Sequence, residues 1–184
     1  MKVLMINGSP RANGCTYRAL TEVKNTVEKE GLECEIIHAS FDRKVVDETL
    51  EKIKECDALV IGSPVYYAST SGLCSWFCDE IFNRQNGSLR LKVGAAVVSA
   101  RRGGESTTFD QINKYFTISE MIVAGSNYWN QVHGNTPAEV EQDIEGLQTM
   151  RVLGRNIAYI CKSLKAANLE LPETEAKIKT NFCR

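Results

Sequence analysis

Apolar and polar positions alternate along the chain in blocks that predict alternating strands and helices. Five short segments have the length and composition of strands, and most of them are largely apolar: residues 2–7, 33–38, 58–62, 92–99 and 120–124. Each is followed by a segment with the composition or spacing of a helix: residues 15–30, 47–55, 73–82, 106–116 and 137–165. Thr136 and Pro137 offer an N-cap and a first turn for the last helix. The chain therefore predicts five successive strand–helix units.

This order of elements predicts the fold class. Strands that are apolar along their whole length are typical of a parallel sheet with helices on both faces. Because crossovers between parallel strands are right-handed, few topologies remain. The simplest is an α/β fold with a doubly wound, five-stranded parallel sheet in the order 2-1-3-4-5. We expect one domain over residues 1–167, followed by a polar tail over residues 168–184 in which Pro172 interrupts any helix.

Three loops at one edge of this sheet are candidates for a ligand site. Ligands of such folds bind beyond the carboxyl ends of the strands, where the strand order reverses. This rule selects loop one (residues 8–16), loop two (residues 62–72) and loop three (residues 99–108).

Loop one has the features of an anion site. It leads from a strand into a helix, so free backbone N–H groups and the helix dipole favour an anion there. Ser9, Asn13 and Thr16 add neutral donors, and Arg11 adds a cation. The glycine spacing matches neither the dinucleotide fingerprint nor the P-loop. The plain alternative is a strand–helix turn capped by serine or threonine.

Loops two and three carry the groups that a flat aromatic cofactor requires. Tyr66 and Tyr67 in loop two supply rings for such a ligand, although a tyrosine pair can also simply pack in a loop. Loop three has a glycine pair, which permits close approach of the backbone. Its Arg101 and Arg102 could stabilise a reduced flavin anion or bind a nucleotide phosphate, and the alternative is a solvated arginine pair.

The segment from Met5 to Thr16, MINGSPRANGCT, resembles the opening of the NADPH-dependent FMN reductase family within the flavodoxin-like superfamily. The resemblance extends over nearly the whole chain and implies an FMN site formed by all three loops. It implies that the FMN phosphate is bound by Ser9, Arg11, Asn13, Cys15 and Thr16. Loop two would line the isoalloxazine ring with Pro64, Val65, Tyr66, Tyr67 and Ala68. Loop three would face the pyrimidine side with Ser99, Ala100, Arg101, Gly103 and Gly104. Cys15 stands where the family usually has a small polar residue, and its position at a helix N-terminus would lower the pKa of its thiol. A bound phosphate dianion would act in the opposite direction, so we do not expect a reactive Cys15 in the FMN-loaded protein.

The resemblance implies an oxidoreductase that uses NADPH or NADH as electron donor. Flavin N5 would be the redox centre, and electrons would pass to a quinone, a flavin or another small acceptor. Arg101 or Arg102 would stabilise the reduced flavin. The alternatives are a non-enzymatic electron carrier or a flavin-binding module without turnover. Carriers of this kind are typically strongly acidic, and the net charge of −1 argues against that alternative.

The cysteines argue against a metal centre. The chain has seven, at scattered positions and with no CxxC pair, so most are expected to be buried, reduced thiols. One branch of the family, the iron–sulfur flavoproteins, has a cysteine cluster between its second strand and the next helix. Residues 39–47 contain no cysteine here, so we expect neither iron nor another metal.

Charge and hydropathy narrow the expected partners. A net charge near zero gives no attraction to nucleic acid, and no apolar run approaches the ~20 residues that span a membrane. We therefore expect a cytoplasmic protein. Tyr128 and Trp129 lie in the polar loop over residues 125–134, which we interpret as a rim of the site or as an oligomer contact. The family, this aromatic pair and the helix face around Trp76 and Phe77 predict a homodimer or homotetramer. His133 is interpreted as a surface histidine rather than a catalytic one.

Overall fold

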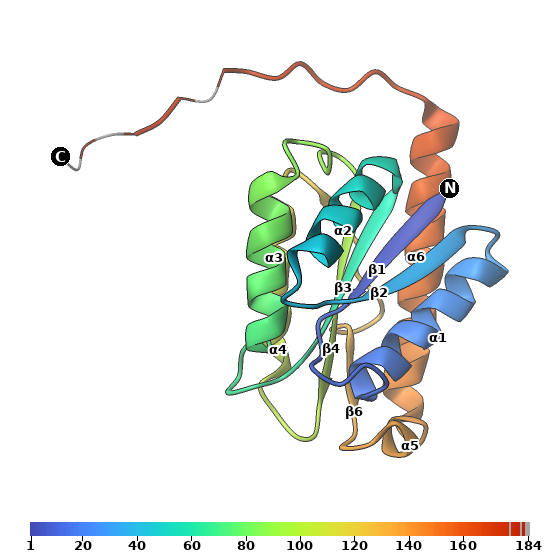
Figure 1. Cartoon of the computed structure of the whole chain (residues 1–184). Helices are drawn as coiled ribbons and strands as arrows, with labels where there is room; N and C mark the ends of the chain where they lie inside the picture. Colours follow the sequence, from blue (N-terminus) through green and yellow to red (C-terminus); the bar gives the residue numbers. More distant parts are fainter. Residues whose placement is uncertain (177, 181, 183–184) are drawn as a thin grey trace.

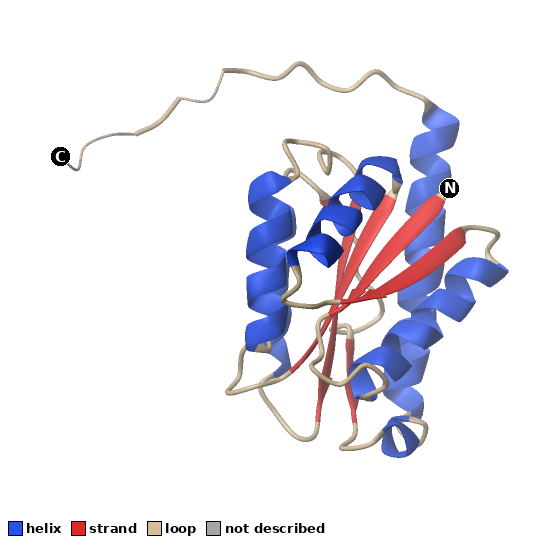
Figure 2. Cartoon of the chain, in the orientation of Figure 1, coloured by secondary structure: helices blue, strands red, loops and turns tan. Residues whose placement is uncertain are grey.

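A central sheet lies between two layers of helices in the computed structural model, which describes residues 1–176, 178–180 and 182 (Figures 1 and 2). The strands are β1 (Lys2–Asn7), β2 (Glu33–His38), β3 (Ala58–Pro64), β4 (Val93–Ala100), β5 (Ile122–Val123) and β6 (Gln131–His133). The helices are α1 (Cys15–Lys29), α2 (Arg43–Glu55), α3 (Gly72–Arg84), α4 (Glu105–Ile118), α5 (Pro137–Val140) and α6 (Ile144–Ala167). Helices α1 and α6 cover one face of the sheet, and α2, α3 and α4 cover the other.

The strand order confirms the doubly wound prediction. The strands run β2-β1-β3-β4-β5, and every pair is parallel. Asn7, the last residue of β1, pairs with His38 of β2 and with Gly62 of β3. These three strands therefore deliver their following loops to the same edge of the sheet.

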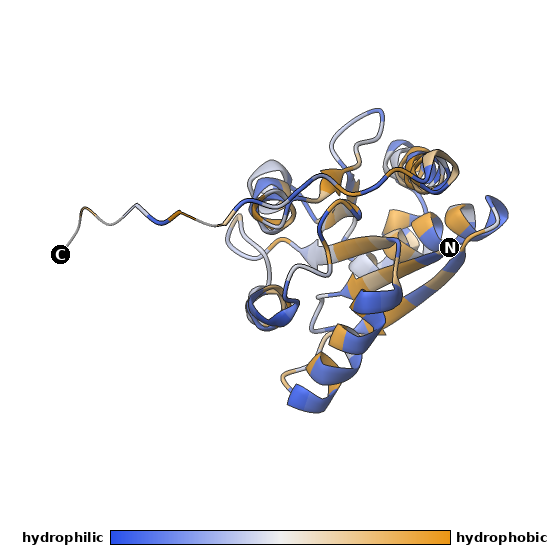
Figure 3. Ribbon diagram, turned by 90° about the horizontal axis from the view of Figure 1, so that it is seen from above, coloured by the Kyte–Doolittle hydropathy of each residue, from blue (hydrophilic) through white to orange (hydrophobic). Residues whose placement is uncertain are grey.

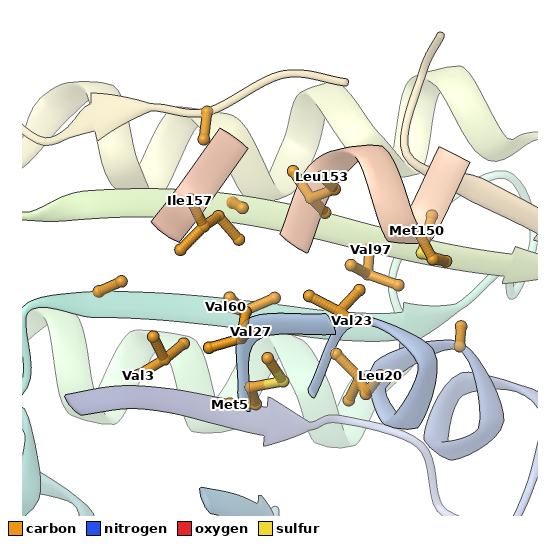
Figure 4. Close-up of a cluster of buried hydrophobic side chains, with 14 of the residues drawn as sticks. Val3, Met5, Leu20, Val23, Val27, Val60, Val97, Met150, Leu153 and Ile157 are labelled. Carbon is orange, nitrogen blue, oxygen red and sulfur yellow. The ribbon is translucent and has the colours of Figure 1, made fainter. Parts of the chain in front are cut away.

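The two faces of the sheet bury separate hydrophobic clusters. Figure 4 shows the cluster between the sheet and helices α1 and α6, where Val60 and Val97 of the strands meet Val23 of α1 and Leu153 of α6. All eight residues of β4 are buried, as expected of a strand covered on both faces. Viewed from above, apolar positions gather on the strands and on the helix faces turned toward them (Figure 3).

The far edge of the sheet differs from the prediction, because the fifth position is shared by two short strands. β5 pairs with the start of β4, and β6 pairs with its end, opposite Val98, Ser99 and Ala100. Between them the chain leaves the sheet, and the buried side chain of Asn130 donates to the Ala96 carbonyl at 3.0 Å and accepts from the Ser126 hydroxyl at 2.7 Å. Three residues with one apolar position carry no periodicity, so the sequence pattern gave no sign of β6.

Two of the predicted helices differ from the structure in their boundaries. The predicted helix over residues 137–165 is two helices, because the Asp143 side chain accepts from the Gly146 amide at 2.9 Å and caps a new helix, α6. Thr136 caps the short α5, as predicted. Helix α2 begins at Arg43 rather than at residue 47, with Asp42 as its N-cap.

The described cysteines are all free thiols. Burial raises the pKa of Cys34 and of Cys161 to about 12, and that of Cys56 to about 11. Cys74 and Cys78 are buried next to each other on α3. Four of these six thiols are buried and two, Cys15 and Cys34, are partly buried, in agreement with the interpretation that most are buried reduced thiols. Cys183 lies outside the described residues.

After α6 ends at Ala167, the described residues of the tail contain no helix or strand and lead away from the sheet (Figure 1). Asn181, part of the segment on which the family resemblance extends to the tail, lies outside the described residues. None of the helices described is both long and apolar enough to span a bilayer.

We predict that Asn130→Ala lowers the free energy of unfolding by about 1–3 kcal/mol, because it leaves the buried Ala96 carbonyl without that donor. Urea denaturation measures this loss. Asn127→Ala is the matched control, since Asn127 is exposed in the same loop and should change stability little. Equal stability of the two variants would contradict the anchoring role of Asn130.

Candidate functional site

A cleft of about 180 Å³ lies at the carboxyl edge of the sheet, where the three predicted loops meet. Its lining residues are Ser9, Arg11, Gly14, Cys15, Thr16, Pro64, Val65, Tyr66, Ser99, Ala100, Arg101, Gly134 and Asn135. Most of the predicted site residues are among them. The others lie in the same loops but outside this lining: Asn13, Tyr67, Ala68, Gly103 and Gly104. The turn between β6 and α5 (residues 134–136, the β6–α5 turn) adds a fourth wall. Of this turn, only Gly134 belongs to the loop that the sequence indicated as a possible rim of the site.

A larger hollow of about 320 Å³ lies at the opposite end of the strands, between β2 and α2. Two exposed ion pairs, Lys2 with Glu55 and Lys52 with Glu35, occupy its rim. It has neither a strand–helix loop nor an aromatic wall, and the carboxyl-edge cleft is the better candidate despite its smaller volume.

The side chain of Asn7 shapes loop one from inside. It is fully buried; its Nδ2 donates to the Ala12 carbonyl at 2.9 Å, and its Oδ1 accepts from the Ser9 amide at 3.2 Å. His38 supports the same loop from β2, with Nε2 2.7 Å from the Ser9 carbonyl oxygen. Sequence reasoning missed both residues, since an asparagine or histidine that ends a strand carries no motif.

The first turn of α1 keeps its backbone donors free for a ligand. Its N-cap, Gly14, gives no side-chain hydrogen bond, and the amides of Cys15 and Thr16 donate to no acceptor within the described part of the chain. Helices α2, α3, α5 and α6 are instead capped by side chains. Free N–H groups at a helix N-terminus fit an anion such as the phosphate of FMN.

Side chains of loop one partly serve its internal geometry. Ser9 Oγ accepts from the Arg11 amide at 3.1 Å, and Thr16 Oγ1 lies 2.8 Å from Ser99 Oγ, which links loop one to loop three. Arg11 and Asn13 are exposed at the rim. A phosphate in the cleft would meet two hydroxyl groups that are already oriented by the protein.

The predicted direction of the pKa shift of Cys15 is wrong. Its Sγ donates to the Gly134 carbonyl at 3.4 Å, and the side chain is partly buried. The pKa of the thiol is raised rather than lowered, because burial disfavours the thiolate more than the nearby Arg11 favours it. Cys15 therefore contributes its backbone amide to the site rather than a reactive thiolate.

Loop two forms a strained hairpin tip. Tyr66 and Ser69 exchange two backbone hydrogen bonds of 2.9 and 3.0 Å, and the central residues Tyr67 and Ala68 have φ of 52° and 56°. This is the conformation of a type I′ turn, which normally takes Asn or Gly. Such strain is typical of functional sites. The side chain of Tyr67 is fully exposed and open to a flat ligand.

Helix α4 holds this hairpin in place. Gln111 Oε1 accepts from Ser69 Oγ at 2.7 Å and from the Thr70 amide at 2.9 Å, and Thr107 Oγ1 donates to the Ala68 carbonyl at 2.9 Å. Gly104, the N-cap of α4, has φ of 94°, and a Cβ there would lie 2.9 Å from Ala68 Cα. Loops two and three are therefore interlocked through a glycine.

The two arginines of loop three differ in position. Both are exposed, but Arg101 lines the cleft and Arg102 does not. Arg101 is thus the better candidate for a charge next to the bound ligand. No group of three or more His, Cys, Asp or Glu side chains that could hold a metal occurs among the described residues.

His133 and the predicted oligomer contact lie beside the cleft. His133 is half exposed, as expected of a surface histidine, but its ring lies between Glu105 and Asp143. Tyr128 and Trp129 are exposed and in edge-to-face contact, with ring centroids 4.8 Å apart. Trp76 is partly buried and Phe77 is fully buried, so Phe77 itself is not available for the contact. Assembly itself stays a prediction.

Comparison with known proteins gives a consistent result. The family model for NADPH-dependent FMN reductase matches residues 1–136. An iron–sulfur flavoprotein of Methanocaldococcus jannaschii is 35% identical, over 90% of this chain and all of that protein. Among solved structures, a flavodoxin, WrbA-like protein from Agrobacterium tumefaciens has a TM-score of 0.72 at 13% identity, covering 88% of this chain and 98% of that one. RosB with bound 8-demethyl-8-formylriboflavin-5'-phosphate has a TM-score of 0.70 at 18% identity, covering 99% and 92%. These two structures support the flavodoxin-like fold.

We predict that Gly104→Ala weakens FMN binding by about tenfold or more, because a Cβ costs about 1–2 kcal/mol at positive φ and also displaces Ala68. Titration of apo protein with FMN, followed by flavin fluorescence, measures the effect. Gly103→Ala is the matched control, since a Cβ at Gly103 meets nothing within 4 Å. If both variants bind FMN like the wild type, the interlocked loops do not form the FMN site.

Proposed function

The chain belongs to the NADPH-dependent FMN reductase family, and we propose that it transfers electrons from NADPH or NADH, through bound FMN, to a quinone, a flavin or another small acceptor. Membership in this family identifies an FMN-binding oxidoreductase. The observation that carries the proposal is the first turn of α1, whose free N–H groups open into the cleft that Tyr66 also lines.

Different residues of the cleft suit different parts of FMN. The amides of Cys15 and Thr16 and the guanidinium of Arg11 suit the phosphate, because each donates a hydrogen bond to an anion. Loop two offers the Tyr67 ring as a flat apolar surface, and the backbone at Gly103 and Gly104 permits close approach. When bound, FMN supplies the group that accepts a hydride and releases electrons.

Arg101 supplies the charge that the reaction requires. Reduction adds negative charge to the ligand in the cleft, and a guanidinium stays protonated at every working pH. Because that charge develops only on reduction, Arg101 should favour the reduced state more than it favours binding. The protein covers one side of the cleft with its loops, so the donor and the acceptor would use the open side in turn. We therefore expect ping-pong kinetics.

An electron carrier is the second candidate. It would bind FMN through the same residues but would not oxidise NADPH or NADH directly. The net charge of −1 offers little attraction to a protein redox partner, which favours the enzyme. Steady-state oxidation of NADPH and NADH by the FMN-loaded protein, with quinones and free flavins as acceptors, decides between them. Retained FMN without turnover would identify a carrier.

We predict that Arg101→Ala slows reduction of the bound FMN by about tenfold, equivalent to about 1.4 kcal/mol of transition-state stabilisation, while FMN affinity changes less. Stopped-flow absorbance at the flavin band, with NADPH and with NADH, gives the rate. Arg102→Ala is the matched control, because this neighbouring arginine does not line the cleft. Wild-type rates in both variants would remove the arginines from the mechanism.

We also predict that the protein holds FMN without an iron–sulfur cluster. The connection between β2 and α2 is only residues 39–42 and contains no cysteine. Protein purified anaerobically should contain no stoichiometric iron or acid-labile sulfide. The M. jannaschii relative, named an iron–sulfur flavoprotein, is the positive control under the same conditions. Stoichiometric iron in this chain would refute the prediction.

A further inference from the structure

A carboxylate is buried directly behind the cleft. Glu105 is the first residue of α4, follows Gly104 and is only 6% exposed. Its Oε1 accepts no hydrogen bond from the described residues. A buried carboxylate is costly unless a cation or several donors compensate it. The first turn of α4 compensates part of this charge through the helix dipole.

The basic side chain that pairs with Glu105 in the described part of the chain is the imidazole of His133. Nε2 of His133 lies 3.0 Å from Glu105 Oε1, at an angle that falls short of a hydrogen bond, and Nδ1 lies 3.5 Å from Asp143 Oδ2. The His133 amide also donates to Asp143 Oδ2 at 2.6 Å. His133 and Asp143 line a small hollow between β6 and the start of α6, and the other titratable side chains that line it are Tyr128, before β6, and Glu145, in the first turn of α6. The surroundings of the ring are therefore acidic on each side.

These contacts join two walls of the cleft. Glu105 lies in loop three, which contributes Ala100 and Arg101 to the lining, and His133 precedes Gly134 and Asn135. Ala100 pairs with His133 across β4 and β6, and its carbonyl accepts from the Gly134 amide at 2.9 Å. His133 is therefore in contact with both walls.

We propose that protonated His133 is a positioning residue that neutralises Glu105 and holds the β6–α5 turn against loop three, so that FMN is bound more tightly when His133 carries a proton. With a neutral ring, Glu105 keeps its charge without a cation, and the contact between the walls weakens. The inference rests on FMN binding in this cleft, and not on which nucleotide or acceptor the proposed function uses.

A double-mutant cycle in FMN affinity tests this coupling. His133→Gln, Glu105→Gln and the double variant are titrated with FMN, by flavin fluorescence, at about pH 6 and about pH 8.5, on either side of the range in which histidines usually titrate. At the lower pH, His133→Gln should weaken binding about tenfold when Glu105 is present and less than about threefold when residue 105 is glutamine. At the higher pH, the difference between wild type and His133→Gln should shrink.

Controls separate this role from simple structural damage. Glu141→Gln removes a carboxylate from the residue after α5 that pairs with Arg18, away from the cleft, so it should follow the wild type at both pH values. The FMN phosphate also titrates in this range. Its effect on FMN affinity is contained in the pH dependence of the control, which is subtracted from that of each variant. Melting temperatures of the apo proteins report folding. Should His133→Gln not fold, Glu105→Gln alone decides, since it should abolish the pH dependence beyond that of the control.

Independent losses in the two single variants, or an effect of His133→Gln that is the same at both pH values, would overturn the inference. Both measurements, the coupling between the two variants and the comparison of the two pH values, use FMN binding alone and require no turnover. A protein that shows the coupling but does not oxidise NADPH or NADH would contradict the proposed function and leave this inference standing.

Discussion

The candidate site depends on the register in which β1 lies between β2 and β3. Because Asn7 pairs with both His38 and Gly62, β1 and β2 end level, β3 continues only to Pro64, and the loops that follow meet at one edge. The buried amide of Asn7 then turns the chain into loop one, and His38 supports that loop from the next strand. A shift of one residue would place the Asn7 side chain on the other face of the sheet and would remove the support of loop one.

Sequence reasoning predicted the features that follow from periodicity. The bounds of β1 and β2 and the start of α1 agree with the structure because strongly apolar strands and a glycine-rich turn mark them. It missed β6 because three residues cannot show a period, and it joined α5 to α6 because Asp143 caps a helix in the middle of a helical pattern. The three loops of the cleft were predicted from fold topology, whereas the β6–α5 turn depends on β6.

Some contacts of the site could not be predicted from residue types. A type I′ turn is normally predicted from Asn or Gly, yet its central residues here are Tyr67 and Ala68. Their strain is tolerated because Gln111 and Thr107, which lie some forty residues later in the chain, fix the hairpin. Side chains that act only through distant contacts leave no local pattern. For the same reason Glu105 and Asp143 were not recognised as neighbours of His133.

The same structure indicates which helix terminus receives the phosphate. Helices α1 and α4 both begin beside the cleft without a side-chain cap. Helix α4 already has the carboxylate of Glu105 in its first turn, and this charge satisfies the positive end of its dipole and repels a second anion. Helix α1 has no acidic residue in its first turn, and Arg11 lies in the loop before it. The electrostatics therefore direct the phosphate to α1 and leave loop three for the part of the ligand whose charge changes during the reaction.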